Sequence, residues 1–359
     1  MWVEQSIFRE DMEYISGVDF IPWEDLRDST ILITGATGLI GFNLVSALAY
    51  IALYKKIPLH ILALVRDEEK ARERFCELLK EEPPISFIIG DMEHIPSIQE
   101  PVDYIIHGGS PTASRYFAEH PVETIQCNLI GAMSLLTLAR EKKSKGFIYL
   151  SSMEVYGSLH RQEKVDENHE TFIDTMNVRN SYPEAKRMVE ALCAGFAGEY
   201  SVPAKVVRLT QTFGVGIRSD ENRVFAQFAR AALRGEDIIL LTDGGTSYSY
   251  LYTADAVTAI FVILLCGGVG EAYNVANEQS YCSIREMAEL VATMDATERL
   301  GYGVVNVCVK ESEDAKKLYP PKRYIDLDTQ KLRKLGWNAK YLLEEMFRRM
   351  MEVHRGDFC

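Results

Sequence analysis

The stretch TILITGATGLIGFNLVSAL, residues 30–48, decides the fold of this chain. Residues 31–33 form a short apolar run of the kind that makes a buried parallel strand. Three glycines follow at three-residue spacing, and apolar side chains then recur at helical spacing as far as residue 48. A strand, a tight glycine turn and a helix in this order predict a dinucleotide-binding unit.

Each glycine of the turn has its own expected role. Gly35 permits the tight turn, Gly38 lets the backbone approach a pyrophosphate, and Gly41 lets the helix pack against the strand. The diphosphate would lie at the helix N-terminus, where free N–H groups and the helix dipole favour an anion. The residues of this turn expected to bind the cofactor are Gly35, Thr37, Gly38, Leu39, Ile40 and Gly41.

Composition and charge exclude several classes of protein. Hydrophobic residues make up 47% of the 359 residues and charged residues 25%, which is ordinary for an enzyme with a packed core. The net charge is −13 and there is no block of Lys and Arg, so we expect no nucleic-acid partner. An anionic substrate would therefore need a local positive pocket within an acidic protein.

The cysteines and the apolar runs indicate the cellular compartment of the protein. The seven cysteines are scattered without a CxxC pair, which predicts reduced thiols in the cytosol rather than disulfides or a metal site. The first residues, MWVEQSIFREDMEYI, are acidic and lack an apolar core, so no signal peptide is expected. The most apolar run, residues 254–265, contains Asp255 and is too short to span a bilayer. We therefore expect a cytoplasmic protein without a membrane segment.

Residues 1–28 precede the first predicted strand. Phe8, Met12 and Ile15 follow the spacing of a short amphipathic helix. We interpret this segment as a structural cap, and the alternative is a role in gating the substrate or in forming a dimer.

The second predicted strand, residues 59–65, ends at Arg66 and Asp67. An acidic residue at this point accepts hydrogen bonds from the adenosine ribose and favours NAD. Arg66 would instead pair with the 2′-phosphate of NADP. In a third arrangement Asp67 takes the ribose while Arg66 stacks on the adenine. The sequence leaves these alternatives open.

Two more strands, residues 85–89 and 104–107, are predicted before a long helix over residues 121–140. Asp91 either accepts from the adenine amino group or closes a turn, and Asn128 either faces the cofactor or is a satisfied polar residue of the core. Small residues after a strand leave room for a cofactor. The cofactor-binding residues expected from these segments are Asp91, Met92, His107, Gly108, Gly109 and Asn128.

A catalytic site is predicted after the fifth strand, residues 147–150, which leads into SSMEVYG. Tyr182 and Lys186 come some 25 residues later and, being four residues apart, share one face of a helix. A lysine beside a phenol favours the phenolate, so Tyr182 becomes a usable base. The hydroxyl of Ser152 would complete the proton-transfer site.

A sixth strand over residues 204–209 is predicted to end the parallel sheet, and the composition changes after Gly214. The remaining elements expected are helices at 224–233, 253–266, 283–294 and 342–354 and strands at 238–241, 272–275 and 303–309. The predicted organisation is a cap at 1–28, a cofactor-binding domain at 29–214 and a mainly substrate-binding lobe at 215–359 with some return to the first sheet.

Together these motifs resemble the extended short-chain dehydrogenases, the NAD-dependent epimerases and dehydratases of nucleotide sugars. The likeness rests on the GxxGxxG turn, Asp91, LSSMEVYG, the Tyr182/Lys186 pair and the tail around LGW. HGGSPTASRYFAEHPVETIQCN is similar to the matching segment of UDP-glucuronate decarboxylases, and sugar-nucleotide 4,6-dehydratases also look close. The resemblance implies an α/β fold with a Rossmann doubly wound parallel sheet and a smaller C-terminal α/β substrate-binding lobe.

SSMEVYG is similar to the family's STSEVYG, which places Ser152 on a catalytic Thr and Glu154 on an active-site Glu. Met153 departs from the Asp that acts as an acid in hexose 4,6-dehydratases, since a thioether cannot donate a proton. Gln211 stands where an Asn usually touches the sugar or phosphate, and Tyr248 where an Arg usually meets the diphosphate. The substrate contacts implied by the resemblance are Ser110, Arg179, Gln211, Arg223, Tyr248 and Arg323.

The resemblance also implies a reaction. Tyr182 takes the proton of a sugar C4 hydroxyl while the C4 hydride moves to NAD, and the 4-keto sugar makes a C6 carboxylate a leaving group. Glu154 would act near C5 or C6, which favours decarboxylation or dehydration over 4-epimerisation, because an epimerase needs no carboxylate there. The alternative role of Glu154 is to brace the site by pairing with Arg179.

Two other classes of function remain as alternatives. An NADP-dependent carbonyl reductase has mild support from Arg66, and a non-catalytic sensor would not need the intact Tyr182/Lys186 pair. The resemblance further implies a role in polysaccharide biosynthesis, a nucleotide-diphosphate sugar as substrate, and a homodimer through helices at 121–142 and 182–200. Leu135, Leu192 and Phe196 are apolar positions compatible with that dimer.

Overall fold

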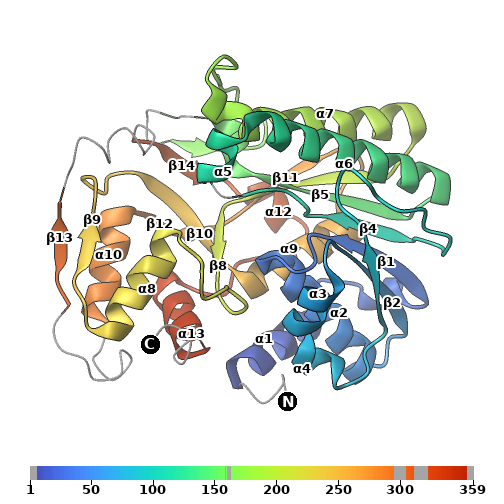
Figure 1. The fold of residues 1–359 in the computed structure, drawn as a ribbon, viewed down its shortest axis with the longest axis horizontal. Coiled ribbons are helices and arrows are strands. Elements are labelled where there is room, and N and C mark those ends of the chain that lie inside the picture. Colours follow the sequence, from blue (N-terminus) through green and yellow to red (C-terminus); the bar gives the residue numbers. More distant parts are fainter. Residues whose placement is uncertain are drawn as a thin grey trace.

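Seven parallel strands form the central sheet, in the order β11-β7-β5-β4-β1-β2-β3 (Figure 1). The computed structural model describes residues 6–112, 114–157, 159, 163–294, 305–310 and 322–353. The strands are β1 (Ser29–Thr34), β2 (Leu59–Val65), β3 (Ile85–Ile89), β4 (Tyr104–His107), β5 (Gly146–Ser152), β7 (Ala204–Leu209) and β11 (Ala272–Val275). The order changes direction at β1, so the loops after β1 and β4 meet at the switch point where such sheets bind ligands.

Helices cover both faces of this sheet (Figure 1). One face carries α6 (Pro121–Lys142) and α7 (Ser181–Tyr200), which lie side by side, and the other carries α2 (Leu39–Tyr54) and α9 (Thr253–Cys266). Shorter helices connect these layers: α3 (Glu68–Arg74), α4 (Cys76–Leu79), α5 (Ser114–Glu119), α12 (Gln330–Arg333) and the single turns η2 (Trp23–Leu26), η3 (Met153–Tyr156) and η4 (Val178–Asn180). The prediction of a Rossmann doubly wound sheet is confirmed.

A second, smaller sheet lies at the other side of the molecule. Its strands run in the order β12-β10-β14-β6, and β8 also pairs with β10. The elements of this lobe are β6 (Lys164–Val165), β8 (Gln211–Phe213), α8 (Val224–Arg234), β9 (Ile238–Leu240), β10 (Ser247–Tyr252), β12 (Asn277–Ser283), α10 (Ile284–Thr293), β13 (Val307–Val309), β14 (Tyr324–Leu327) and α13 (Leu343–Val353).

The strands of the main sheet divide their side chains between two apolar layers. On β1, Ile31 and Ile33 face the α2/α9 side, while Leu32 faces the α6/α7 side. This alternation with period two is what a strand covered on both faces requires. The α2/α9 layer continues into the lobe through β8 and β10, so the two halves of the molecule share one core.

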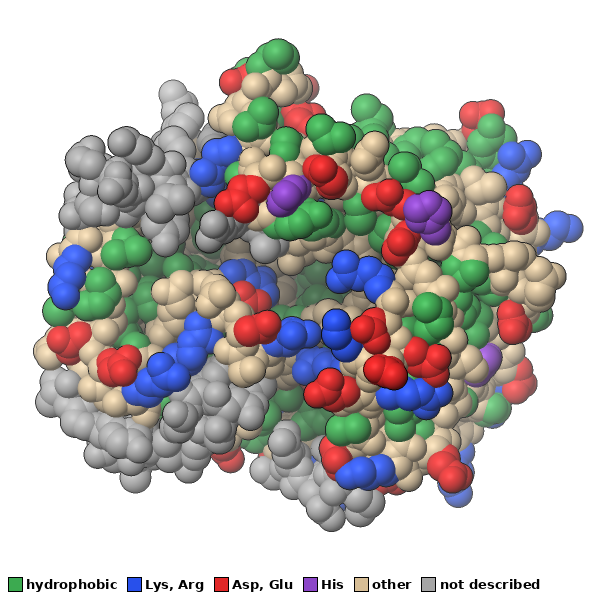
Figure 2. Space-filling model, viewed as in Figure 1, with side chains coloured by type: hydrophobic (Ala, Val, Ile, Leu, Met, Phe, Trp, Pro, Cys, Tyr) green, Lys and Arg blue, Asp and Glu red, His purple; other side chains and the backbone are tan. Residues whose placement is uncertain are grey.

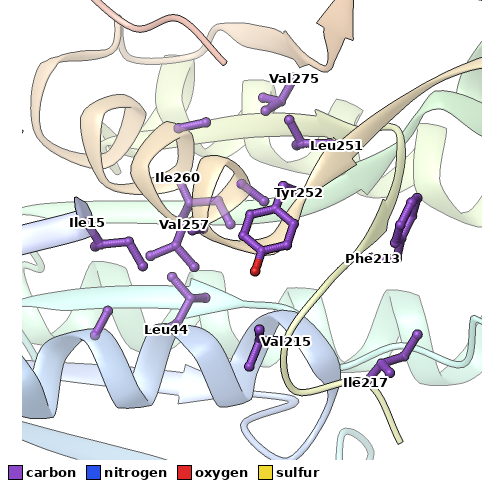
Figure 3. Close-up of a cluster of buried hydrophobic side chains, with 14 of the residues drawn as sticks. Ile15, Leu44, Phe213, Val215, Ile217, Leu251, Tyr252, Val257, Ile260 and Val275 are labelled. Atoms are coloured by element: carbon purple, nitrogen blue, oxygen red, sulfur yellow. The ribbon is translucent and has the colours of Figure 1, made fainter. Parts of the chain in front are cut away.

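The segment before β1 forms α1 (Ser6–Gly17), which packs against α2, α9 and α13. Ile15 of α1 lies near Leu44 of α2 and Val257 of α9 in the cluster drawn in Figure 3. Asp11 is fully buried and accepts from Arg349 Nη2 and the Tyr252 hydroxyl, each at 2.7 Å. Apolar packing and a buried ion pair therefore tie α1 to the C-terminal helix.

Helix α6 is long and apolar enough to cross a bilayer by length and composition alone. Its Leu135, Leu136 and Ala139 are buried beneath α7 and the sheet. Leu135 and Phe196 are thus part of the monomer core and are not available for a dimer contact, in contrast to the role considered for them from the sequence.

Several predicted elements need correction. The sheet does not end at β7, because α9 leads the chain back to it and β11 pairs with β7. Residues 68–79 form two short helices, α3 and α4, separated at Phe75, whose ring turns into the core and stacks on Phe42 at 5.5 Å. Residues 303–304 of a predicted strand and His354 of a predicted helix lie outside the described residues.

Candidate functional site

The turn between β1 and α2 has the geometry expected of an anion-binding loop. Gly35 has φ +69°, a conformation that favours glycine, and a Cβ there would lie 2.7 Å from the Gly108 carbonyl oxygen. A Cβ at Gly41 would lie 2.2 Å from the Gly35 carbonyl oxygen. Both positions therefore need glycine for close packing of the turn on the helix and on the loop after β4.

Gly38 serves a different purpose. A Cβ there would meet only the Gly35 carbonyl oxygen, at 3.2 Å, so the space beside it is open. No side chain caps α2, and its first turn holds no acidic residue. The N–H groups of Leu39, Ile40 and Gly41 at the start of α2 thus fit the diphosphate of a dinucleotide.

The loop after β4 closes the other side of this turn. Thr34 Oγ1 lies 2.8 Å from His107 Nδ1 and accepts from the Gly109 N–H at 3.2 Å. Burial lowers the pKa of His107 to about 3, so the imidazole is neutral at physiological pH. His107 and Gly109 therefore hold the two loops together at the switch point of the sheet.

The acidic residues expected at the adenosine end take part in local turns. Asp67 caps α3 by accepting from the Lys70 N–H at 3.1 Å, and Arg66 is exposed. Asp91 Oδ1 accepts from the N–H groups of Glu93 and His94 at 2.9 and 2.7 Å. The turn role considered for Asp91 is therefore present, and its contact with adenine stays a prediction.

Asn128 and Met92 support the loop after β4. Asn128 is fully buried, accepts from the Ser110 hydroxyl at 2.9 Å and donates to the Thr124 carbonyl at 2.8 Å. A Cβ on Gly109 would lie 2.6 Å from Met92 Sδ, so this methionine packs against the loop. The alternative of a satisfied polar core residue describes Asn128 in this structure.

Tyr182 and Lys186 both lie on the buried face of α7, directed at the end of β5. Ser152 lies close enough to the Tyr182 hydroxyl to lower the pKa of the phenol. Lys186 Nζ donates to the Leu150 carbonyl at 2.8 Å and lies 5.4 Å from the centre of the Tyr182 ring. The three residues expected to carry catalysis are thus brought together.

Burial shifts the ionisation of both groups towards the neutral form. It raises the pKa of the Tyr182 phenol, with a further rise from the Glu154 carboxylate, while Ser152 and Arg223 act in the opposite direction. It also lowers the pKa of Lys186 to about 7. Perturbed groups of this kind gather at reaction sites.

Glu154 pairs with Arg323 and not with Arg179. The Glu154 Oε2 and Arg323 Nη1 atoms are 2.7 Å apart, and both side chains are mostly buried. Burial opposes ionisation of the Arg323 guanidinium, but the Glu154 carboxylate and the neighbouring Tyr248 outweigh it and raise its pKa. The ion pair joins η3 of the main domain to the segment leading into β14 of the lobe.

The remaining expected substrate residues lie around this pair. Arg223, at the start of α8, pairs with Glu221 at 2.7 Å and is close enough to Tyr182 to affect its pKa. Gln211 begins β8 and is half-buried, and Arg179 lies in η4. Figure 2 shows a hollow in the middle of one face, where several Lys and Arg side chains gather. A local positive site within an acidic protein is what an anionic substrate requires.

Met153 cannot supply the acid that dehydratases use. It is buried, and its Sδ atom lies 3.3 Å from the Thr210 hydroxyl, which donates to it.

Tyr149 was not predicted from the sequence to be part of the site, yet the centre of its ring lies 4.7 Å from Lys186 Nζ. A tyrosine within the apolar strand FIYL was the available signal.

Comparison with known proteins agrees with this geometry. The model of the NAD dependent epimerase/dehydratase family matches residues 31–276. UDP-glucuronic acid decarboxylase 1 of Xenopus tropicalis is 26% identical over 355 residues, covering 98% of this chain and 78% of that protein. UDP-glucuronic acid decarboxylase 5 of Arabidopsis thaliana is 28% identical over 263 residues, covering 71% of this chain and 72% of that protein.

Solved structures share the fold at lower identity. A UDP-glucose 4-epimerase of Thermotoga maritima, solved with UDP-glucose, aligns with a TM-score of 0.74 at 22% identity, covering 91% of this chain and 99% of that one. A dTDP-glucose 4,6-dehydratase of Streptomyces venezuelae, solved with NAD bound, aligns with a TM-score of 0.75 at 20% identity, covering 91% and 97%.

Proposed function

This chain belongs to the NAD-dependent epimerase/dehydratase family, and from that premise we propose that it decarboxylates a nucleotide-diphosphate sugar that carries a C6 carboxylate. The reaction would start with oxidation of the C4 hydroxyl. The observation that carries the proposal is the buried Glu154–Arg323 ion pair next to Tyr182. The curated relatives named above support the same choice, since they are UDP-glucuronic acid decarboxylases.

The first step needs a base at the C4 hydroxyl. In this role Tyr182 takes the hydroxyl proton as phenolate. Burial disfavours that form, and Ser152 and Arg223 lower the pKa of the phenol in its favour. Lys186, when protonated, adds a positive charge beside the ring. The chemistry that bound NAD⁺ supplies is acceptance of the hydride from C4. The residues that would hold its diphosphate are Gly35, Gly38 and the start of α2.

The second step breaks the C5–C6 bond. The electron pair of that bond moves towards the C4 ketone oxygen, carbon dioxide leaves, and C5 then accepts a proton. C4 finally regains its hydride, so the sugar loses only carbon dioxide and there is no net oxidation. Glu154 and Arg323 lie together on the lobe side of Tyr182, where they can act on C5 or C6. A 4-epimerase has no use for such a pair, and Met153 lacks the proton that dehydration by an Asp would need.

Incubation with a panel of nucleotide sugars, followed by mass measurement of the products, tests the proposal. Loss of the mass of carbon dioxide from a C6-carboxylate sugar is the expected result. Loss of the mass of water would mean dehydration, and an unchanged mass with altered chromatographic mobility would mean epimerisation. Bound NAD⁺ in the purified protein and turnover without added cofactor would reject a net reductase.

We also propose a homodimer formed through α6 and α7. Six apolar or aromatic residues of these helices are exposed, with exposed fractions from 38% to 60%: Val122, Ile125, Ile130, Met133, Met188 and Tyr200. An apolar surface of this kind often marks an interface. We further propose a cytoplasmic enzyme, because the six cysteines within the described residues are free thiols. We propose no membrane association, because the apolar helix α6 buries Leu135, Leu136 and Ala139 in the core.

A further inference from the structure

Lys186 is the most deeply buried cation of the catalytic site, with 2% of its surface exposed. Its Nζ atom has a single hydrogen-bond acceptor given by the described residues, the Leu150 carbonyl oxygen at 2.8 Å. Two aromatic rings lie close to the same atom, Tyr149 at 4.7 Å and Tyr182 at 5.4 Å from the ring centres. Both distances fall within the range of cation–π attraction, and Tyr149 is the closer ring.

Tyr149 is held rigidly in this position. It lies on β5, beside the His107 ring on β4, with the ring centres 5.5 Å apart, and it is 1% exposed. Its hydroxyl is buried and has no hydrogen-bond partner among the described residues. The phenol oxygen is therefore costly to bury, and the contact that the residue makes with the site is through its ring face.

The other charged or titratable groups around Lys186 do not form a direct ion pair with it in the described residues. They come from three elements, namely Tyr182 and Glu190 on α7, Cys127 on α6 and His107 on β4. Glu190 favours the ammonium, but its carboxylate is already bound by Arg208 at 2.7 Å and by the Ser151 hydroxyl at 2.6 Å. Burial outweighs these effects and lowers the pKa of Lys186 to about 7.

We propose that Tyr149 is a positioning residue for the reaction, because its ring face holds the Lys186 ammonium charged and in place between β5 and α7. This inference rests on the proposed function in one respect, because it assumes that the Lys186 ammonium assists Tyr182 as the base. A desolvated cation over an aromatic face is stabilised enough to move its ionisation by about one pH unit. Without the ring, the ammonium would lose its proton at lower pH.

The ionisation of Lys186 can be followed directly, without turnover. The chemical shift of isotopically labelled lysine Cε is recorded against pH, and the Lys186 signal is assigned by its loss in Lys186→Met. In the unsubstituted protein we expect a midpoint near 7. Tyr149→Leu should lower this midpoint by about one unit, while Tyr149→Phe should leave it unchanged because it retains the ring.

A second aliphatic variant, Tyr149→Met, keeps the test valid if Tyr149→Leu does not fold. If an active substrate is found, kcat can also be measured against pH. The fall in kcat on the alkaline side should begin at a lower pH in both aliphatic variants than in Tyr149→Phe. Equal midpoints in all variants would overturn the proposal, and so would a shift in Tyr149→Phe as large as in Tyr149→Leu. Absence of turnover on every nucleotide sugar would defeat the proposed function while leaving the Lys186 titration readable.

Discussion

Glu154 and Arg323 are 169 positions apart in the sequence, yet Glu154 Oε2 lies 2.7 Å from Arg323 Nη1. Glu154 follows the fifth strand of the main sheet, and Arg323 comes from the lobe immediately before β14. The pair therefore forms only when the two halves of the molecule are assembled. In the proposed reaction, its position beside Tyr182 is what would add cleavage of the C5–C6 bond to C4 oxidation.

Gly38→Val should abolish cofactor binding without unfolding the protein. Gly38 has φ −72° and ψ 173°, which any residue adopts, and an added Cβ meets only one atom within 4 Å. The side chain would instead fill the space expected for the diphosphate. Absorbance of bound dinucleotide and thermal unfolding check this. As a matched control, Gly41→Ala should destabilise the fold, because its Cβ would lie 2.2 Å from a carbonyl oxygen. Retention of the cofactor by Gly38→Val would show that this turn does not bind it.

Asp11→Ala should lower the free energy of unfolding by about 3 kcal/mol, because it leaves a buried guanidinium without its buried partner. Arg349 is 5% exposed in its side chain and Asp11 is 1% exposed. Glu10→Ala is the control, since Glu10 also pairs with Arg349 but is 56% exposed, and we expect a loss below about 1 kcal/mol. Denaturant unfolding measures both. If Asp11→Ala lost activity at unchanged stability, residues 1–28 would have a role in the reaction rather than that of a cap.

Glu278→Gln should reduce stability at neutral pH but not in strong acid. Burial opposes ionisation of this carboxylate, but hydrogen bonds from Lys164 and Thr329 outweigh it and hold the pKa of Glu278 at about 2. Because this pKa lies below the unfolded value, the ionised Glu278 stabilises the folded protein at neutral pH. That stabilisation is lost as the carboxylate becomes protonated, while the pH falls through 4 towards 2. The free energies of unfolding of Glu278→Gln and of the parent protein, measured against pH, should therefore converge over that interval. A constant difference down to the lowest pH would contradict the assignment.

Ile125→Glu and Met188→Glu should each convert the dimer to a monomer. Both residues are apolar and exposed on adjacent helices, so a charge there would be buried without a partner at the interface. Ile239→Glu is a matched control in β9 of the lobe, with the same exposed fraction as Ile125, 38%. Sedimentation at micromolar concentration distinguishes the states. A monomeric parent protein would reject the proposed interface.

Local patterns were enough to predict most of the main sheet. The glycine turn, the apolar strands and the spacing of Tyr182 and Lys186 each depend on residues close in sequence, so period and turn chemistry reveal them. The start of the helix predicted from residue 283 is local in the same way, because Ser283 and Glu286 form a capping box within four residues of sequence.

Long-range pairing accounts for what the sequence did not reveal. The Glu154–Arg323 pair depends on how the lobe docks, so Arg179, which is near in sequence to Tyr182, was the more obvious partner for Glu154. A return of the C-terminal part to the first sheet was expected, but β11 was not identified as the strand that makes it, because its pairing with β7 depends on how α9 packs on the sheet. Tyr149 looked like an ordinary apolar-strand residue, since the distance from its ring to Lys186 depends on the packing of α7 against β5.

The most direct test of the account compares Tyr182→Phe with Glu154→Gln in a single-turnover reaction on a C6-carboxylate nucleotide sugar. Tyr182→Phe removes the base for C4 oxidation, so no reduced nicotinamide should appear. Glu154→Gln keeps the shape of the side chain but loses its charge, so reduced nicotinamide should accumulate while cleavage is slowed by about 10²–10⁴-fold. Equal loss of the reduced-nicotinamide signal in both variants would remove Glu154 from the cleavage step and contradict the proposed reaction.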